Sequence, residues 1–257
     1  IEGSNAIFKH KEDEPNETVL IAGCAATIIP EGTTIIDDYA FCECENLTTI
    51  NLPATIETFN GSVFSGCDAI TQIIVDEGNE NFVTYGGALY SVNYEELLFY
   101  PRNLNGNMRE LHPDLQKIGP KIFQNNPKIT QVYISKNITH IGEYAFEGCQ
   151  QLNEVVFEEG VGALTIGGAA FANCINLTAI ALPEGITTLS DNLFYNTGLT
   201  SFVIPESVTR VEFAALAGTK ITTIHIPANV EFIGDAAFYG CTNMTGITFA
   251  DGDKPLE

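Results

Sequence analysis

Basic residues are scarce in this chain of 257 residues. Lys and Arg number 11 against 33 Asp and Glu, which gives a formal net charge of -22. A field of that sign repels a phosphate backbone, and no basic stripe in the sequence offsets it. We therefore expect no nucleic-acid partner, and we interpret the acidic composition as a property that keeps a long surface in solution.

Long apolar runs are missing as well. Hydrophobic residues make up 45% of the chain, but no run approaches the ~18 residues that a transmembrane helix needs, and no signal-peptide pattern opens the sequence. We expect a soluble polypeptide with no membrane-spanning segment. Because the chain begins with Ile1 and its first repeat is incomplete, we also expect a segment of a longer precursor, with any export signal or anchor lying elsewhere.

Motifs that carry chemistry are lacking too. The sequence has no Gly-rich phosphate loop, no serine nucleophile elbow and no His-Glu-x-x-His segment. None of the four His has a second plausible ligand in its own repeat. The paired carboxylates at 37–38 and 158–159 fall in predicted turns, where solvated charge is the ordinary explanation. We expect no enzyme activity, no catalytic residues, no metal site and no cofactor.

An internal repeat is what the sequence does contain. Residues 27–53 read TIIPEGTTIIDDYAFCECENLTTINLP, and the same order of Pro, aliphatic pair, Ala-Phe and Leu-x-x-Ile-x-Leu recurs almost to the end. Phe41 and Phe64 are 23 residues apart, as are Phe123 and Phe146, and the last repeats shorten to 22. A fixed period of this length predicts one elongated array of stacked coils.

Each repeat has a physical reason for its pattern. Ile50 and Leu52 alternate with Thr49 and Asn51, as a strand with one buried face requires. The Pro that follows cannot donate a ladder hydrogen bond and ends the strand. Stacked coils bury about six apolar groups each, at roughly 1.5 to 3 kcal/mol apiece before chain entropy is subtracted.

Five of the seven cysteines occupy the same slot, three residues after the repeat Phe. They are Cys44, Cys67, Cys149, Cys174 and Cys241. We interpret the slot as a ladder of small buried side chains. A bridge between neighbouring coils, such as Cys44 with Cys67, stays open because stacked coils lie about 4.8 Å apart. The Cys42-x-Cys44 pair lacks the second pair that a metal site needs.

Two segments show the repeat most clearly, IGEYAFEGC at 141–149 and IGDAAFYGC at 233–241. They resemble the BspA-like family of leucine-rich repeats, and the resemblance covers residues 27–249. Local departures are Leu216 in place of Phe, Asn126 and Thr219 in place of Cys, and a two-residue insertion near 161–163. The resemblance implies an α/β-type repeat solenoid that is mainly β. We expect a right-handed stack of nine or ten coils, with one long parallel sheet and short strands or 3-10 turns on the opposite side.

The domain organisation follows from where the period holds. We expect residues 1–26 to form a hairpin or partial insert that caps the array, because a solenoid must cover its open end. Residues 27–257 form the solenoid. The period breaks at about 76–110, where two apolar patches predict a hairpin-like insert within one enlarged coil.

Outward positions of the strands are the best candidates for a binding surface. Tyr133 places an aromatic ring beside Gln131 and Glu154 of adjoining coils, so we predict a ligand-binding patch there for protein or glycan. The alternative is that these are ordinary surface residues of a strand. The family resemblance implies a non-enzymatic recognition module, extracellular or on the cell surface, that adheres to host or cell-surface proteins or glycans. A passive spacer that presents another domain is the competing hypothesis.

Overall fold

The computed structural model describes residues 5–10, 18–59, 63–104 and 111–250. Across these ranges the regular elements are all β-strands, and no helix long and apolar enough to cross a membrane occurs among them. The chain divides into two compact units, residues 1–104 and 105–257. Parts of the predicted N-terminal hairpin (1–4 and 11–17), of the predicted insert (105–110) and of the C-terminus (251–257) lie outside the described residues.

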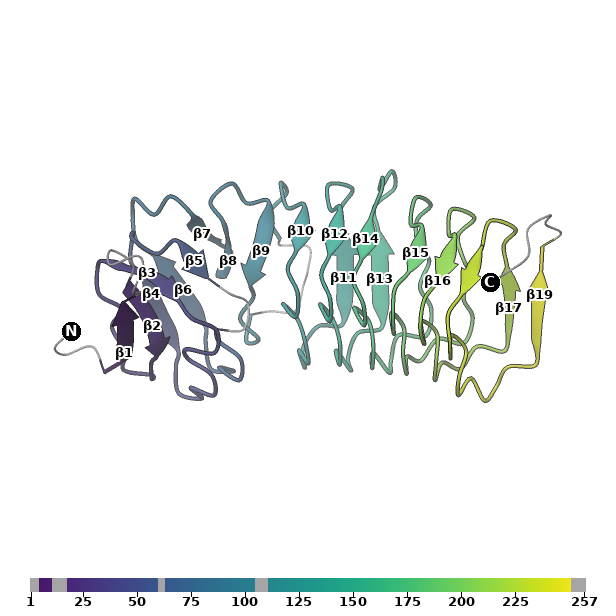
Figure 1. The fold of residues 1–257 in the computed structure, drawn as a ribbon, viewed down its shortest axis with the longest axis horizontal. Helices are drawn as coiled ribbons and strands as arrows, with labels where there is room; N and C mark the ends of the chain where they lie inside the picture. The colour runs from purple at the N-terminus through teal and green to yellow at the C-terminus, as the bar shows by residue number, and fades with distance from the viewer. Residues whose placement is uncertain (1–4, 11–17, 60–62, 105–110, 251–257) are drawn as a thin grey trace. The chain divides into compact units, whose positions relative to one another are not determined.

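The first unit combines parallel coil strands with antiparallel hairpins (Figure 1). Its strands are β1 (Ile7–His10), β2 (Thr18–Ala22), β3 (Thr33–Ile36), β4 (Thr49–Leu52), β5 (Thr58–Phe59), β6 (Gln72–Val75), β7 (Phe82–Tyr85), β8 (Ala88–Ser91) and β9 (Glu96–Phe99). Strand β1 pairs with β2 antiparallel, and β2, β3 and β5 then pair in parallel. Strands β4 and β6 form a parallel pair, while β7, β8 and β9 form an antiparallel meander.

Between residues 111 and 250 the second unit is built from repeat coils. Its strands are β10 (Lys117–Ile118), β11 (Gln131–Ile134), β12 (His140–Ile141), β13 (Glu154–Phe157), β14 (Thr165–Ile166), β15 (Thr188–Leu189), β16 (Arg210–Val211), β17 (Thr223–Ile226), β18 (Phe232–Ile233) and β19 (Gly246–Phe249). Two-residue strands form the parallel ladders β10-β12-β14 and β15-β16-β18. Four-residue strands form the parallel pairs β11-β13 and β17-β19 (Figure 1).

The ladder of four-residue strands is interrupted, which differs from the long sheet that the repeat predicts. Residues 178–182 and 200–204 run between β13 and β17 in sequence and form no strand. The preceding coil carries the insertion at 161–163 and spans 25 residues, the next coil spans 23, and the later coils span 22. Backbone bonds at the start of each segment persist, such as Thr200 N to Thr178 O at 3.1 Å. The change in coil length thus coincides with the loss of ladder register beyond those bonds.

Stacked phenylalanines form the centre of the second unit. The ring centroids of Phe123 and Phe146 are 5.0 Å apart, those of Phe146 and Phe171 are 5.3 Å apart, and those of Phe171 and Phe194 are 5.9 Å apart. Interplanar angles in this column are 15° or less, and all four side chains are fully buried. In the first unit, Phe41 and the ring of the next coil lie 5.6 Å apart but are tilted by 37°. In these coils the aromatic ring is therefore buried against the ring of a neighbouring coil.

The cysteine slot is explained by its hydrogen bonds. The thiols of Cys67, Cys149 and Cys174 are buried, and each donates to the carbonyl of the Phe one coil earlier, at 2.8, 3.0 and 3.2 Å. Where Thr197 fills the slot, its hydroxyl donates to the Phe carbonyl of its own coil at 3.0 Å. Asn126 instead accepts from two backbone amides that follow it. The slot thus calls for a small side chain that satisfies buried backbone groups.

Candidate recognition surface

The parallel pair β11-β13 brings the three predicted patch residues together. In its register Gln131 lies opposite Glu154, and Tyr133 lies opposite Val156. The amide Nε2 of Gln131 donates to Oε2 of Glu154 at 2.5 Å. Because side chains two residues apart in a strand share a face, Tyr133 projects on the same side as this pair. Gln131 and Tyr133 are half-buried, whereas Glu154 is exposed.

A pocket of about 300 Å³ adjoins this face at Tyr133. Apolar atoms of Leu111, Leu115 and Ile138 contribute to its wall, and Ser135, Asn137, Lys136, His112, Pro113 and Glu158 complete the lining. The pocket therefore presents one aromatic ring, an aliphatic wall and hydrogen-bonding groups of both kinds. That combination is typical of sites that take a side chain or a sugar of a partner.

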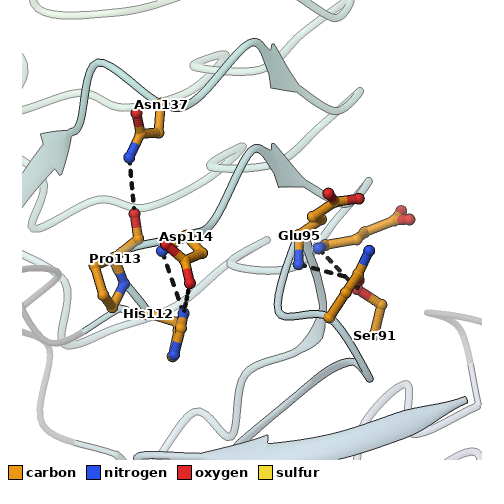
Figure 2. A network of polar contacts seen from close by, with 8 residues as sticks. Ser91, Glu95, His112, Pro113, Asp114 and Asn137 are labelled. Carbon is orange, nitrogen blue, oxygen red and sulfur yellow. Dashed lines mark hydrogen bonds and ion pairs between the residues drawn. The ribbon is translucent and has the colours of Figure 1, made fainter. Parts of the chain in front are cut away.

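Hydrogen bonds within a turn and between neighbouring turns hold the pocket wall, as Figure 2 shows. The Asn137 amide points to the carbonyl of Pro113 and donates to it at 3.0 Å. The ring of His112 accepts from the backbone N–H of Asp114 at 3.2 Å, and its Nδ1 lies 3.9 Å from the Asp114 carboxylate. These contacts fix the shape of the wall before any ligand arrives.

Charge at the pocket is balanced by one cross-coil pair. A carboxylate oxygen of Glu158 accepts from the backbone N–H of Lys136 at 2.9 Å, and the Lys136 ammonium lies 3.9 Å from the other oxygen. The Glu158–Glu159 pair, interpreted from sequence as solvated charge, thus contributes one carboxylate to a structural bond. In the first unit Asp37 has a comparable role, because the ammonium of Lys9 donates to it at 2.9 Å and holds the pKa of that carboxyl below its usual value.

A shallow hollow of about 470 Å³ lies beside Glu154 on its other side. Asn153, Glu154 and Val155 line one wall, and Ala179, Ile180 and Ala181 line the other. The second wall is the segment that forms no strand, and its outward side chains are small. The patch therefore lies between two recesses, each of which includes one of its residues.

Sequence reasoning placed Gln131, Tyr133 and Glu154 on adjoining coils but missed the pocket and its lining residues His112, Lys136 and Glu158. One signal was present. Ser135 follows β11 at the position where other repeats have Pro, as in Pro53 or Pro227. Within the part of the chain that the structure describes, no group of three or more His, Cys, Asp or Glu side chains is arranged to hold a metal ion.

Stacked coils with short parallel ladders, a buried Phe column and an asparagine- or cysteine-filled turn define a mainly β leucine-rich-repeat solenoid. Comparison with known families places this chain among the leucine-rich-repeat proteins. Six copies of the BspA type leucine rich repeat region match residues 23–105 and 116–245, and the chain belongs to that family. No curated protein matches its sequence significantly.

Solved structures of bacterial leucine-rich-repeat proteins share the fold. A protein from Bacteroides ovatus is 21% identical, with a TM-score of 0.53 over 96% of this chain and 64% of that one. One from Eubacterium ventriosum is 21% identical, with a TM-score of 0.52 over 76% of this chain and 64% of that one. The pneumococcal vaccine antigen PcpA is 17% identical, with a TM-score of 0.51 over 89% of this chain and 54% of that one. This chain thus spans only about half to two thirds of their length.

Proposed function

We propose that this chain is a non-enzymatic recognition module, secreted or displayed on a cell surface, that binds a protein or glycan ligand in adhesion. Its ligand contacts the outer face of β11-β13 through Gln131, Tyr133 and Glu154. The observation that carries the proposal is Tyr133, a half-buried aromatic ring shared by this face and the 300 Å³ pocket. Membership of a repeat family whose solved relatives include an antigen supports an accessible location.

Physical features of the patch favour recognition over a passive role. An aromatic ring beside fixed hydrogen-bonding groups supplies both contact area and orientation. The Gln131–Glu154 bond holds both side chains in place, so less side-chain entropy is lost when a ligand binds. A net charge of -22 argues against a nucleic-acid ligand and speeds encounter with basic partners.

We further propose the domain organisation and handedness that go with this role. Residues 1–26 cap a right-handed solenoid that occupies 27–257, and the region near 76–110 is an insert within one enlarged coil. Right-handed crossovers between parallel strands are the general rule in proteins.

Limited proteolysis tests the proposed division into cap and solenoid. A capping segment that protects the array resists cleavage until the array itself unfolds.

A binding screen followed by paired variants tests the function. The chain is first screened against matrix proteins, cell-surface proteins and a glycan array. The double variant Tyr133→Ala/Glu154→Gln is then compared with a matched control, His225→Ala/Thr248→Ala, which removes another cross-coil contact, 3.0 Å long, from the same unit. We expect the patch variant to lose about 10-fold or more in affinity, as truncation of a central aromatic anchor does.

Two outcomes contradict the proposal. Equal affinity in the patch variant and wild type excludes this face as the contact site. No binding to any protein or glycan favours the alternative function, a spacer that holds another domain away from a surface. Far-ultraviolet circular dichroism of both variants shows whether each retains the fold.

A further inference from the structure

Three cysteines lie close together at the beginning of the first stack. Cys24 follows β2, and Cys42 and Cys44 lie in the turn of the first repeat Phe. Cys24 and Cys42 are exposed, whereas Cys44 is half-buried. Burial raises the pKa of the Cys44 thiol, and the nearby thiols of Cys24 and Cys42 raise it further. Cys44 is therefore within electrostatic reach of both other thiols.

Direct contacts hold the Cys24 backbone against this turn. The N–H of Gly23 donates to the carbonyl of Ala40 at 2.7 Å, and the thiol of Cys44 donates to the carbonyl of Gly23 at 3.7 Å. That carbonyl belongs to the peptide group that joins Gly23 to Cys24. A Cβ atom at Gly23 would lie 2.3 Å from the ring of Phe41, so only glycine allows the segment to approach so closely.

Cys44 differs from the other members of the cysteine ladder in what lies beneath it. Cys67, Cys149 and Cys174 are buried and donate short bonds, of 3.2 Å or less, to a Phe carbonyl one coil earlier. Half-buried Cys241 likewise donates to the Leu216 carbonyl one coil earlier at 3.2 Å, whereas the bond of Cys44 goes to Gly23, is 3.7 Å long and is weaker. The residue next to its acceptor is itself a cysteine. Of the ladder thiols, that of Cys44 therefore loses the weakest hydrogen bond when it forms a bond to another group.

We propose that Cys24 and Cys44 are a disulfide site, which closes when the protein meets an oxidising environment and ties the segment after β2 to the first coil. The Cys44 sulfur lies 3.7 Å from the carbonyl oxygen of Gly23, whose peptide group is shared with Cys24, so the two cysteines are neighbours across the first coil. The bond then requires their sulfurs to turn toward each other. The proposal also replaces the bridge between Cys44 and Cys67 that sequence reasoning left open, because the Cys67 thiol is buried and bonded to Phe41.

A low-molecular-weight disulfide, such as glutathione disulfide, supplies the oxidising equivalents. The exposed Cys24 thiolate attacks one sulfur of that disulfide, forms a mixed disulfide and releases one glutathione thiolate. The Cys44 thiolate then attacks the Cys24 sulfur and releases the second glutathione. Each released thiolate takes up a proton that a cysteine gave to solvent, so two protein thiols are oxidised as one disulfide is reduced to two thiols. The Thr27 hydroxyl lies 3.7 Å from the Cys24 sulfur and donates at 3.0 Å to the Asn5 carbonyl, to which the Cys24 thiol also donates at 3.6 Å.

Peptide mapping after oxidation tests the site. The reduced protein is incubated with excess glutathione disulfide, alkylated without reductant, digested and analysed by mass spectrometry. We expect a linked pair of peptides that contain Cys24 and Cys44, with Cys149 and Cys174 recovered as free thiols after unfolding. Cys24→Ser and Cys44→Ser each abolish the link, and the control Cys42→Ser retains it.

Several results would overturn the proposal. A dominant link between Cys24 and Cys42 or between Cys44 and Cys67 assigns the site elsewhere. Recovery of mixed disulfides with glutathione alone shows that Cys24 and Cys44 do not meet. Because Cys24 is exposed, Cys24→Ser folds without loss of packing, and its circular dichroism spectrum keeps the comparison valid if Cys44→Ser is unstable.

Discussion

Single residues around each repeat Phe adopt left-handed backbone conformations at two positions, one two residues before the Phe and one two residues after it. The earlier position holds Tyr39, Lys121, Tyr144, Ala169, Asn192, Ala214 and Ala236, and the later holds Glu43, Gly66, Asn125, Gly148, Asn173, Asn196, Gly218 and Gly240. Glycine fills the later position in four coils and so marks that turn in the sequence. The earlier position holds no glycine in any of these coils, so the sequence does not mark it as a left-handed residue.

A matched pair of substitutions in the last coil measures this strain. Ala236 has φ of 59° and is exposed, so Ala236→Gly removes a steric cost and raises the free energy of unfolding by up to about 1 kcal/mol. Gly240 has φ of 70° and only ordinary contacts for an added Cβ, so Gly240→Ala lowers it by about 1 to 2 kcal/mol. Urea unfolding of both variants measures whether the free energy of unfolding rises for Ala236→Gly and falls for Gly240→Ala. The same change in both variants would show that these turns carry no backbone strain.

Cys67 gives the first unit a dependence on alkaline pH. Burial raises the pKa of its thiol to about 11, while an unfolded chain loses that proton near pH 8.5. Between these values the unfolded state binds fewer protons than the folded state, so the free energy of unfolding falls as pH rises. We expect wild type to lose more stability than Cys67→Val between pH 8 and 11 in parallel urea titrations. Parallel curves for the two proteins would mean that Cys67 ionises without cost when folded.

In the second unit the coils pack on one another through the column of stacked rings. Phe146 lies between two neighbours, with centroids 5.0 and 5.3 Å away and nearly parallel planes. We expect Phe146→Ala to cost about 3 to 5 kcal/mol and Phe146→Leu clearly less, since Leu216 fills the same slot in a later coil. The exposed Tyr144→Ala is the control. Denaturant unfolding that finds Phe146→Ala as mild as the control would contradict a continuous column.

Some features of the strands could be predicted from the sequence, and others could not. The alternation in Ile50 and Leu52 predicted both the strand and its buried face, because a period of two leaves only one set of residues for the core. The column of Phe rings followed from the fixed period. The interruption at 178–182 and 200–204 did not follow, because these segments keep the repeat pattern. Their loss of strand structure coincides with a change in coil length from 25 residues to 23 and then 22, which the pattern within one repeat does not record.

The positions of the candidate site residues could be predicted from the sequence, but the pocket beside them could not. Register between adjoining coils placed Gln131 opposite Glu154, since equal repeat positions stack. The pocket beside Tyr133 was not predictable, because its wall combines the turn of one coil at Pro113 with the strand end of the next at Ser135. Its shape depends on side-chain packing between turns of different composition.

At the scale of the whole molecule, charge is distributed unevenly between the two units. Residues 1–104 contain 17 Asp and Glu against 3 Lys and Arg, a net charge of -14, and residues 105–257 contain 16 against 8, a net charge of -8. The proposed ligand face lies in the less acidic unit. The coils of that unit supply contact area and fixed side-chain positions for such a face.

Hydrogen exchange of the ligand-bound protein tests the central claim most directly. Amide exchange is measured by mass spectrometry with and without the ligand that the screen identifies. Protection is predicted in peptides that cover 131–138 and 154–158, with no change in peptides that cover β17 and β19. Protection confined to other coils, with exchange at Tyr133 and Glu154 unaltered, would contradict the assignment of this face as the recognition surface.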